Sequence, residues 1–415
     1  MTLSQKRKKQ KYFKKKKSNN YHSNHQIMKL RNLFLAGIAA FAMASCSNEV
    51  EGIDNGDNGN AVKNATVRFS IGFPATTRAA STEAGTDAEQ GIQKITAVLV
   101  YNDGSPIQVL NFAKNELAQE KTTVTTDAKE VYAGSGNVYV YVNSAFEITA
   151  DNYLTATASA AYNNTLDGLV DNIAKADNFL MSGKSNFTAV AGSSTNTAKV
   201  TVSRVAAKIR EASSKDAYTA KSQENLKITL KRYTFTNLNK TSNVLAGSIF
   251  KPENNSGYFQ YFKRDNTALK TFDGLATKTI GEESTNITYC MENENSDATT
   301  QILYEAQATI GDNGIKNLYV VTSGDKQGVY PSFEDLDKAY GNQLSKDAYG
   351  NLSDASDYGA FSKYGIKKYT NGICYYAQDI TTNGVTAAKI MRNNIYQLTV
   401  KGIDGLGEPG IDIPT

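Results

Sequence analysis

Short runs of alternating apolar and polar residues recur along this chain and limit it to a mainly β fold. The runs lie at 65–73, 94–101, 107–112, 137–145, 198–209, 226–238, 285–293, 300–310, 316–323, 372–380 and 394–403. Clusters of Gly, Asn, Asp and Ser separate them, and successive side chains of a strand point to opposite faces. Because the chain holds only six prolines, the pattern favours β-sandwiches over disorder.

Within this pattern we expect few and short helices. Residues 165–176 carry apolar residues at helical spacing, from Leu166 to Ile173, and predict one helix. Residues 331–365 are rich in Asp, Gly, Ser and Tyr and predict a long surface excursion, with one short helix near 332–341.

One run changes its phase. In 226–238, Leu226, Ile228 and Leu230 share one face, whereas Tyr233 and Phe235 share the other. An extra residue in a strand reverses the alternation, so this run predicts a β-bulge near Lys231 and Arg232.

The amino-terminal residues indicate a removable leader. Residues 1–27 hold nine Lys or Arg and no acid, which alone would also fit a basic nucleic-acid-binding arm. Met28 then opens an ordinary signal peptide, because an apolar run at 33–45 ends in small residues and is too short to span a bilayer. We therefore expect residues 1–45 to be a leader and signal peptide, with translation starting at Met28.

Removing the leader changes the charge of the chain. Residues 1–45 contain 11 of the 45 Lys and Arg and none of the 41 Asp and Glu, so the remainder carries 34 − 41 = −7. An acidic chain has no general attraction to nucleic acid, and none is expected as a partner. Both histidines, His22 and His25, lie in the leader, which excludes catalysis and metal binding by histidine.

The residue that follows the leader predicts a lipid anchor. Met43 to Cys46 fits a bacterial lipobox, in which small residues admit the peptidase and the Cys46 thiol receives a diacylglyceryl group. Residues 46–64 then form an acidic, Gly- and Asn-rich tether, and Glu49 and Glu51 resemble the acidic tags that export Bacteroidetes lipoproteins to the surface.

The remaining motifs give no sign of an active site. The run at 54–60 lacks the closing Glu of a calcium loop, and nucleotide-binding, zinc-protease and serine-hydrolase motifs are absent, so we expect no enzyme, metal or cofactor. Cys290 and Cys374 could form a disulfide in an oxidising compartment, or could be two buried small apolar residues.

A lone arginine follows the first strand run. The alternation of Val67, Phe69, Ile71 and Phe73 stops at a proline, and Arg78 then stands among Ala, Thr and Ser. Such a segment has no large apolar residue to bury, which makes it accessible to a protease.

Several phrases resemble the fimbrillins of Bacteroidetes, the stalk pilins of type V pili, and most closely the major subunit of short fimbriae. They are 178–183, 200–209, 287–293, 369–380 and above all MRNNIYQLTVKGIDGLGEPG at 391–410. The resemblance implies two transthyretin-like β-sandwich domains in tandem, and the polar stretch at 210–225 divides them into 65–210 and 211–415.

The same resemblance gives the chain a function. It implies export as a palmitate-bearing outer-membrane lipoprotein, cleavage between Arg78 and Ala79 by an arginine-specific protease, and polymerisation into a surface fimbrium that supports adhesion and biofilm formation. Cleavage would remove the strand that holds Val67, Phe69, Ile71 and Phe73, and a strand from another subunit would replace it. The implied partners are further pilin subunits together with accessory and anchor pilins.

The end of the chain departs from this pattern. Stalk pilins of this kind continue past the GLGEPG phrase into a final apolar strand, whereas only Ile411 and Ile413 alternate here before Pro414. Two isoleucines contribute about 3–6 kcal/mol at full burial. We therefore expect the chain to accept a donated strand well and to donate one poorly.

Two other functions fit the same residues. One is an accessory or tip adhesin of the same pilus, and the other is a surface lipoprotein that binds glycans or, acting through two carboxylates, hydrolyses them. The tyrosines at strand-like spacing favour core positions over an exposed binding platform, and no particular pair of acids stands out.

We predict that Cys46→Ser abolishes acylation and halts the precursor before surface display, because the thiol is the group that receives the lipid. Labelling cells with radioactive palmitate measures this directly. Continued palmitate labelling of the variant would contradict the assignment of the lipobox.

Overall fold

The computed structural model describes residues 63–74, 85–120, 123–159, 161–171, 173–247, 249–261, 277–281, 286–381 and 389–410. Residues Asn60–Thr415 form one compact unit. The described part of the chain contains no helix that is long and apolar enough to cross a membrane.

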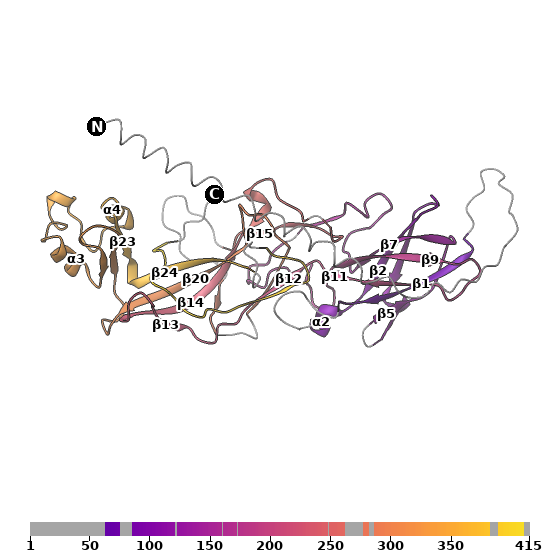
Figure 1. Ribbon diagram of the computed structural model, residues 1–415, viewed down its shortest axis with the longest axis horizontal. Helices are drawn as coiled ribbons and strands as arrows, with labels where there is room; N and C mark the ends of the chain where they lie inside the picture. The colour runs from indigo at the N-terminus through magenta and orange to yellow at the C-terminus, as the bar shows by residue number, and fades with distance from the viewer. Residues whose placement is uncertain are drawn as a thin grey trace, which may run out of the picture. The chain divides into compact units, whose positions relative to one another are not determined.

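Two five-stranded sheets, here called the N-terminal sheets, are built from residues 65–204 (Figure 1). The first has the order β10-β1-β5-β4, with β6 also paired to β1, and the second has the order β11-β9-β7-β2-β3. Their strands are β1 (Ala65–Gly72), β2 (Lys94–Tyr101), β3 (Gln108–Ala113), β4 (Leu117–Gln119), β5 (Thr123–Thr126), β6 (Lys129–Val131), β7 (Gly134–Val142), β9 (Met181–Ala189), β10 (Thr197–Thr201) and β11 (Ser203–Arg204). The short helices α2 (Asp87–Gln90) and η2 (Lys114–Glu116) connect them.

Two further sheets, here called the C-terminal sheets, have the orders β19-β12-β25 and β13-β14-β20-β24, with β18 paired to β14. Their strands are β12 (Ala207–Glu211), β13 (Ala217–Thr219), β14 (Leu226–Thr236), β18 (Lys278–Thr279), β19 (Ile287–Cys290), β20 (Gln301–Ile310), β24 (Ile373–Asp379) and β25 (Ile395–Leu398). Two-stranded pairs join β8 (Thr157–Ser159) to β16 (Thr241–Asn243), and β15 (Leu238–Asn239) to β17 (Tyr258–Phe259), which follows η3 (Asn255–Gly257). The predicted mainly β fold with few short helices is confirmed, and the division into domains at 210 and 211 stays a prediction.

The predicted bulge is confirmed. β14 and β20 pair continuously except for a register shift between Leu230 and Arg232. Leu230 and Tyr233 are both buried, and the bulge puts them on the same face of the strand although they are three positions apart.

The predicted helix at 165–176 is wrong. The backbone is left-handed at Leu166 (φ 62°) and at Gly168 (φ 81°), which no α-helix tolerates. The segment bonds to β19 instead, because the Leu169 amide donates to the Tyr289 carbonyl at 3.2 Å and the Tyr289 amide donates to the Asp167 carbonyl at 3.0 Å. Leu166, Leu169 and Ile173 are buried as their spacing suggested, but in a chain of turns.

The predicted surface excursion has a core of its own. It lies within residues 311–372, which connect β20 to β24 and form the sheet β22-β21-β23 with helices around it; this part is called the inserted lobe. Its elements are β21 (Leu318–Val321), β22 (Gly328–Tyr330), α3 (Phe333–Ala339), η4 (Asp347–Tyr349), α4 (Tyr358–Ser362), β23 (Ile366–Tyr369) and η5 (Thr370–Gly372). The helix near 332–341 is confirmed as α3, and the side chain of Ser332 caps it by accepting from the Asp335 amide.

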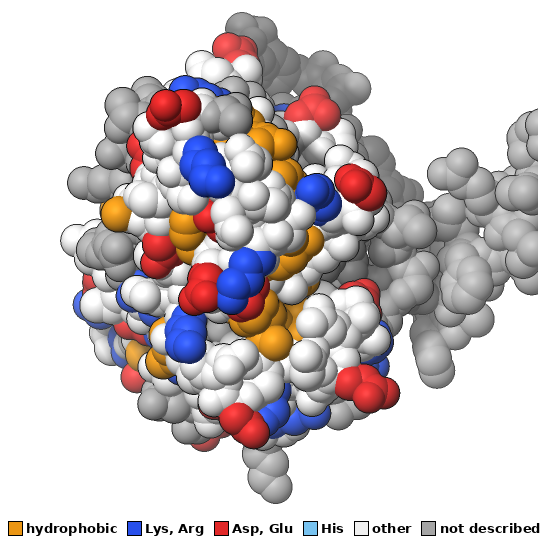
Figure 2. Space-filling view, turned by 90° about the vertical axis from the view of Figure 1, so that its left-hand side faces the viewer, with side chains coloured by type: hydrophobic (Ala, Val, Ile, Leu, Met, Phe, Trp, Pro, Cys, Tyr) orange, Lys and Arg blue, Asp and Glu red, His pale blue; other side chains and the backbone are white. Residues whose placement is uncertain are grey.

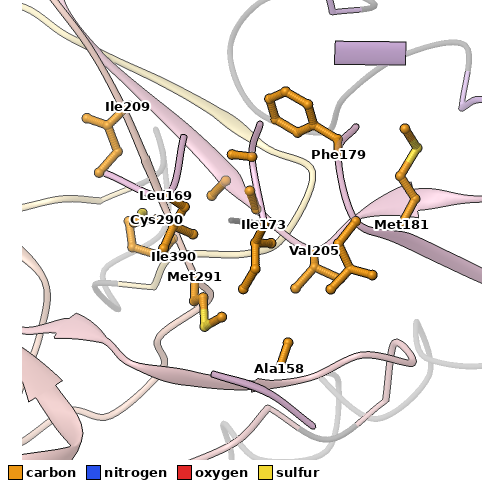
Figure 3. Close-up of a cluster of buried hydrophobic side chains, with 14 of the residues drawn as sticks. Ala158, Leu169, Ile173, Phe179, Met181, Val205, Ile209, Cys290, Met291 and Ile390 are labelled. Carbon is orange, nitrogen blue, oxygen red and sulfur yellow. The ribbon is translucent and has the colours of Figure 1, made fainter. Parts of the chain in front are cut away.

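The main core continues from the N-terminal sheets into the C-terminal sheets. Figure 3 shows part of it, where Ile173 and Val205 gather in one cluster with Ile209, Cys290 and Ile390. All five are at most 6% exposed, so an unbroken apolar core crosses the place where the chain passes from one pair of sheets to the other.

Candidate functional site

Strand β1 is held by neighbours along both of its edges. It pairs in parallel with β10, with Phe69 opposite Ala198. On its other edge it pairs antiparallel with β5 and β6, with Ile71 opposite Val124 and Ala65 opposite Val131. The backbone hydrogen-bonding groups on both sides of β1 are therefore engaged by other strands, so its loss would leave two unpaired strand edges.

The apolar face of β1 is fully buried. Val67, Phe69 and Ile71 are 0% exposed, and the ring of Phe69 meets the ring of Phe112 edge to face at 5.8 Å between centroids. Each such side chain contributes about 1.5–3 kcal/mol on burial. Phe73, the fourth residue of the predicted set, lies beyond the end of the strand and is half-buried against the same core.

Polar side chains fix the register of β1. Asn196 accepts from the Arg68 amide through its backbone carbonyl at 3.0 Å and donates its side-chain amide to the Thr66 carbonyl at 2.9 Å. The Thr126 hydroxyl accepts from the Phe69 amide at 3.0 Å. Sequence reasoning missed Asn196 and Thr126, because nothing in a lone Asn or Thr reveals which distant strand it bonds.

Arg68, the charged residue of β1, does not enter the apolar core. The side chain of Arg68 points to solvent while its backbone is paired with Thr197, so the buried face of the strand carries no charge. The space that β1 fills between β10 on one side and β5 and β6 on the other is here called the channel. It is neutral and apolar and has hydrogen-bonding edges, which suits an extended peptide segment.

The other predicted site residues divide into two groups. Cys46, Arg78 and Ala79 lie outside the described residues, as do Ile411 and Ile413. Cys290 and Cys374 are both buried and are free thiols in this structure, where they lie in β19 and β24 of different sheets. Burial raises the pKa of the Cys290 thiol to about 12 and also raises that of Cys374.

In the described part of the chain, no group of three or more His, Cys, Asp and Glu side chains is arranged to hold a metal ion.

Comparisons with known proteins support the resemblance drawn from the sequence. Residues 367–415 match the family described as major fimbrial subunit protein type IV, fimbrillin, C-terminal. The resemblance to fimbrillins is thus confirmed, and it rests on the end of the chain. A comparison of the whole chain with curated proteins found no match.

The chain also matches solved structures at low sequence identity. Two putative cell adhesion proteins from Parabacteroides distasonis have TM-scores of 0.47 at 15% and 13% identity, covering 83% and 85% of this chain and 94% and 91% of theirs. The tip fimbrial protein Mfa3 from Porphyromonas gingivalis, with C-terminal truncation, has a TM-score of 0.33 at 11% identity, covering 81% of this chain and 95% of that chain.

We predict that Phe69→Ala lowers the free energy of unfolding by about 3–5 kcal/mol, because it empties a fully buried position in β1. Urea unfolding followed by circular dichroism measures the loss. The matched control is Phe73→Ala, which removes the same side chain from a half-buried position and should cost clearly less. Equal losses for the two variants would show that β1 does not depend on its buried face.

Proposed function

We propose that this chain is a structural subunit of a cell-surface fimbria and has no enzymatic activity. The observation that carries the proposal is the position of β1, which lies between β10 and β5 with its apolar face buried. An extended strand of another subunit can fill the same channel. The fimbrillin match at residues 367–415 supports the same assignment. Its partners are other pilin subunits, including accessory and anchor pilins.

The chain reaches the surface as a lipoprotein. The leader at 1–45 directs export, Cys46 carries the acyl chains, and these chains hold the precursor in the outer membrane. The tether at 46–64 separates the lipid from the first strand by a Gly- and Asn-rich segment, which lets a folded precursor stand clear of the membrane.

Maturation is a cut between Arg78 and Ala79 by an arginine-specific protease. The nearby alternative is Arg68, but its amide donates to Asn196 and its backbone lies between two strands, which protects it. A protease needs an extended segment free of such pairing. Cleavage beyond the end of β1 separates that strand from the rest of the chain, so only its hydrogen bonds and buried side chains then retain it.

The loss of β1 makes a partner strand necessary. Its three large and fully buried apolar residues, Val67, Phe69 and Ile71, contribute about 5–9 kcal/mol. A whole domain has a stability of about 5–15 kcal/mol, so an empty channel is costly. A strand donated by another subunit restores both the buried area and the edge hydrogen bonds, and this drives assembly.

The second candidate function is an accessory or tip adhesin of the same pilus. The inserted lobe favours this function. It has its own core and is inserted in the sequence between the paired strands β20 and β24, so it displays surface that the main sheets do not require. Figure 2 looks onto the side where α3 and α4 lie, and hydrophobic side chains there lie between basic and acidic ones. Half-buried aromatic residues of the lobe include Tyr330, Phe333 and Tyr340.

We predict that Arg78→Ala yields a folded, lipidated monomer that does not polymerise, because β1 stays covalently attached. Negative-stain microscopy after treatment with an arginine-specific protease gives the readout. The matched control is Arg68→Ala, which removes an exposed arginine ten positions earlier and should leave cleavage and fibres intact. Normal fibres from Arg78→Ala would place the maturation cut elsewhere.

We further predict that a synthetic peptide of residues 63–74 inhibits assembly of the cleaved protein, because it refills the channel. The rate and length of fibre growth, followed by light scattering and microscopy, measure the inhibition. A control peptide with Ser in place of Val67, Phe69 and Ile71 keeps the backbone groups but not the apolar face, and it should not inhibit. Equal inhibition by both peptides, or by neither, would argue against strand exchange in this channel.

A further inference from the structure

The chain crosses from the N-terminal to the C-terminal sheets through a very short link. β11 ends at Arg204 and β12 begins at Ala207, so only Val205 and Ala206 lie between a strand of one sheet and a strand of another. Short links between packed bodies are where hinge motions concentrate. Both link residues are buried, at 0% and 3% exposed, so other parts of the protein surround this link.

A single carboxylate binds the residues on both sides of the link. The Arg204 guanidinium donates through Nη1 to Glu89 Oε2 at 3.0 Å, and Lys208 Nζ lies 2.8 Å from Glu89 Oε1. The three side chains are 10%, 6% and 3% exposed for Arg204, Lys208 and Glu89. Glu89 thus connects the last residue of β11 to the second residue of β12.

The carboxylate itself is fixed on the N-terminal side. Glu89 Oε2 also accepts from the Thr86 amide at 3.1 Å, which closes a capping box on α2. A helix of four residues has little stability of its own, and its neighbours hold it. The Ala88 carbonyl accepts from the Asp177 amide at 2.7 Å, and the Gly91 carbonyl accepts from the Asn143 side chain at 2.8 Å.

Tyr289 and Asn393 bind the cluster and the link from the C-terminal side. The Tyr289 hydroxyl, from β19, donates to Glu89 Oε1 at 2.6 Å. Asn393, just before β25, accepts from Arg204 Nε at 2.9 Å, and its amide donates to the Ala206 carbonyl of the link at 2.9 Å. Elements of both pairs of sheets therefore meet at one ion cluster.

Glu89 is held in its charged form despite its burial. Burial opposes the charge, but hydrogen bonds from Lys208 and Tyr289 and the charge of Arg204 outweigh it and lower the pKa of Glu89. Burial also lowers the pKa of Arg204 and raises that of Tyr289. A cluster with two cations and one anion needs this anion, because without it two buried positive charges face each other.

We propose that Glu89 is a hinge lock, which fixes the angle between the N-terminal and C-terminal sheets by binding both cations that flank the link. The subunit is then one stiff body, and bending at Val205 and Ala206 requires that the carboxylate release Lys208 and Tyr289. The proposal concerns the single, uncleaved subunit and does not depend on strand exchange.

The experiment measures a distance across the link, which changes when the angle between the sheets changes. Nitroxide labels are placed at Lys199→Cys in β10 and Lys227→Cys in β14, both exposed, in a full chain with Cys46→Ser. Cys290 and Cys374 are buried and should stay unlabelled. Double electron–electron resonance should give one narrow distance distribution for the labelled parent. Glu89→Gln should lose this single narrow peak and give a broad or divided distribution.

Two further variants make the result decisive. Glu305→Gln removes the partner of Arg232, an ion pair with Nε–Oε1 at 2.9 Å that lies within β14 and β20, and should keep the narrow peak. If Glu89→Gln does not fold, Lys208→Met removes the cation that the carboxylate binds on the C-terminal side, and it should broaden the distribution in its place. A narrow peak in the folded Glu89 or Lys208 variant, or equal broadening in Glu305→Gln, would overturn the lock.

Discussion

The burial of one strand face governs the N-terminal half of this molecule. Val67, Phe69 and Ile71 are fully buried on β1, and the two edges of β1 bond to β10 on one side and to β5 and β6 on the other. While β1 is in place, these inner strand edges are closed and the channel is filled. Under the proposed strand exchange, another chain would supply the same contacts that stabilise the single chain, and one set of residues would serve both stability and assembly.

Much of this arrangement follows from the spacing of apolar residues, because a strand with one buried face imposes a period of two on its sequence. β1 and the bulge at Leu230 and Arg232 could be predicted in this way. The period says nothing about partners, however. That β1 lies parallel to β10, more than a hundred residues away, is decided by the packing of whole sheets. The roles of Asn196, Thr126 and Glu89 depend on the same distant contacts.

The failures of prediction have physical causes of the same kind. The apolar spacing from Leu166 to Ile173 reports burial correctly, but backbone bonds to Tyr289 and left-handed residues exclude the helix. Residues 331–365 of the inserted lobe predict a surface excursion because they are rich in Asp, Gly, Ser and Tyr. Leu336, Leu344 and Phe361 nevertheless converge with Tyr319 into one small core, which only the three-dimensional path of the chain could reveal.

The stretch between β1 and β2 brings the two main proposals together. Residues from Thr86 onward are held by Glu89, by the Ala88 carbonyl and by the Gly91 carbonyl, each bonded to a different distant segment. A cut after Arg78 lies before this anchored part. It would therefore free β1 without disturbing α2 or the cluster at Arg204 and Lys208, so the channel could empty while the joint between the sheets stays closed. Under the two proposals, the subunit would change only at the surface where its neighbour binds and would keep the stiffness that a fibre requires.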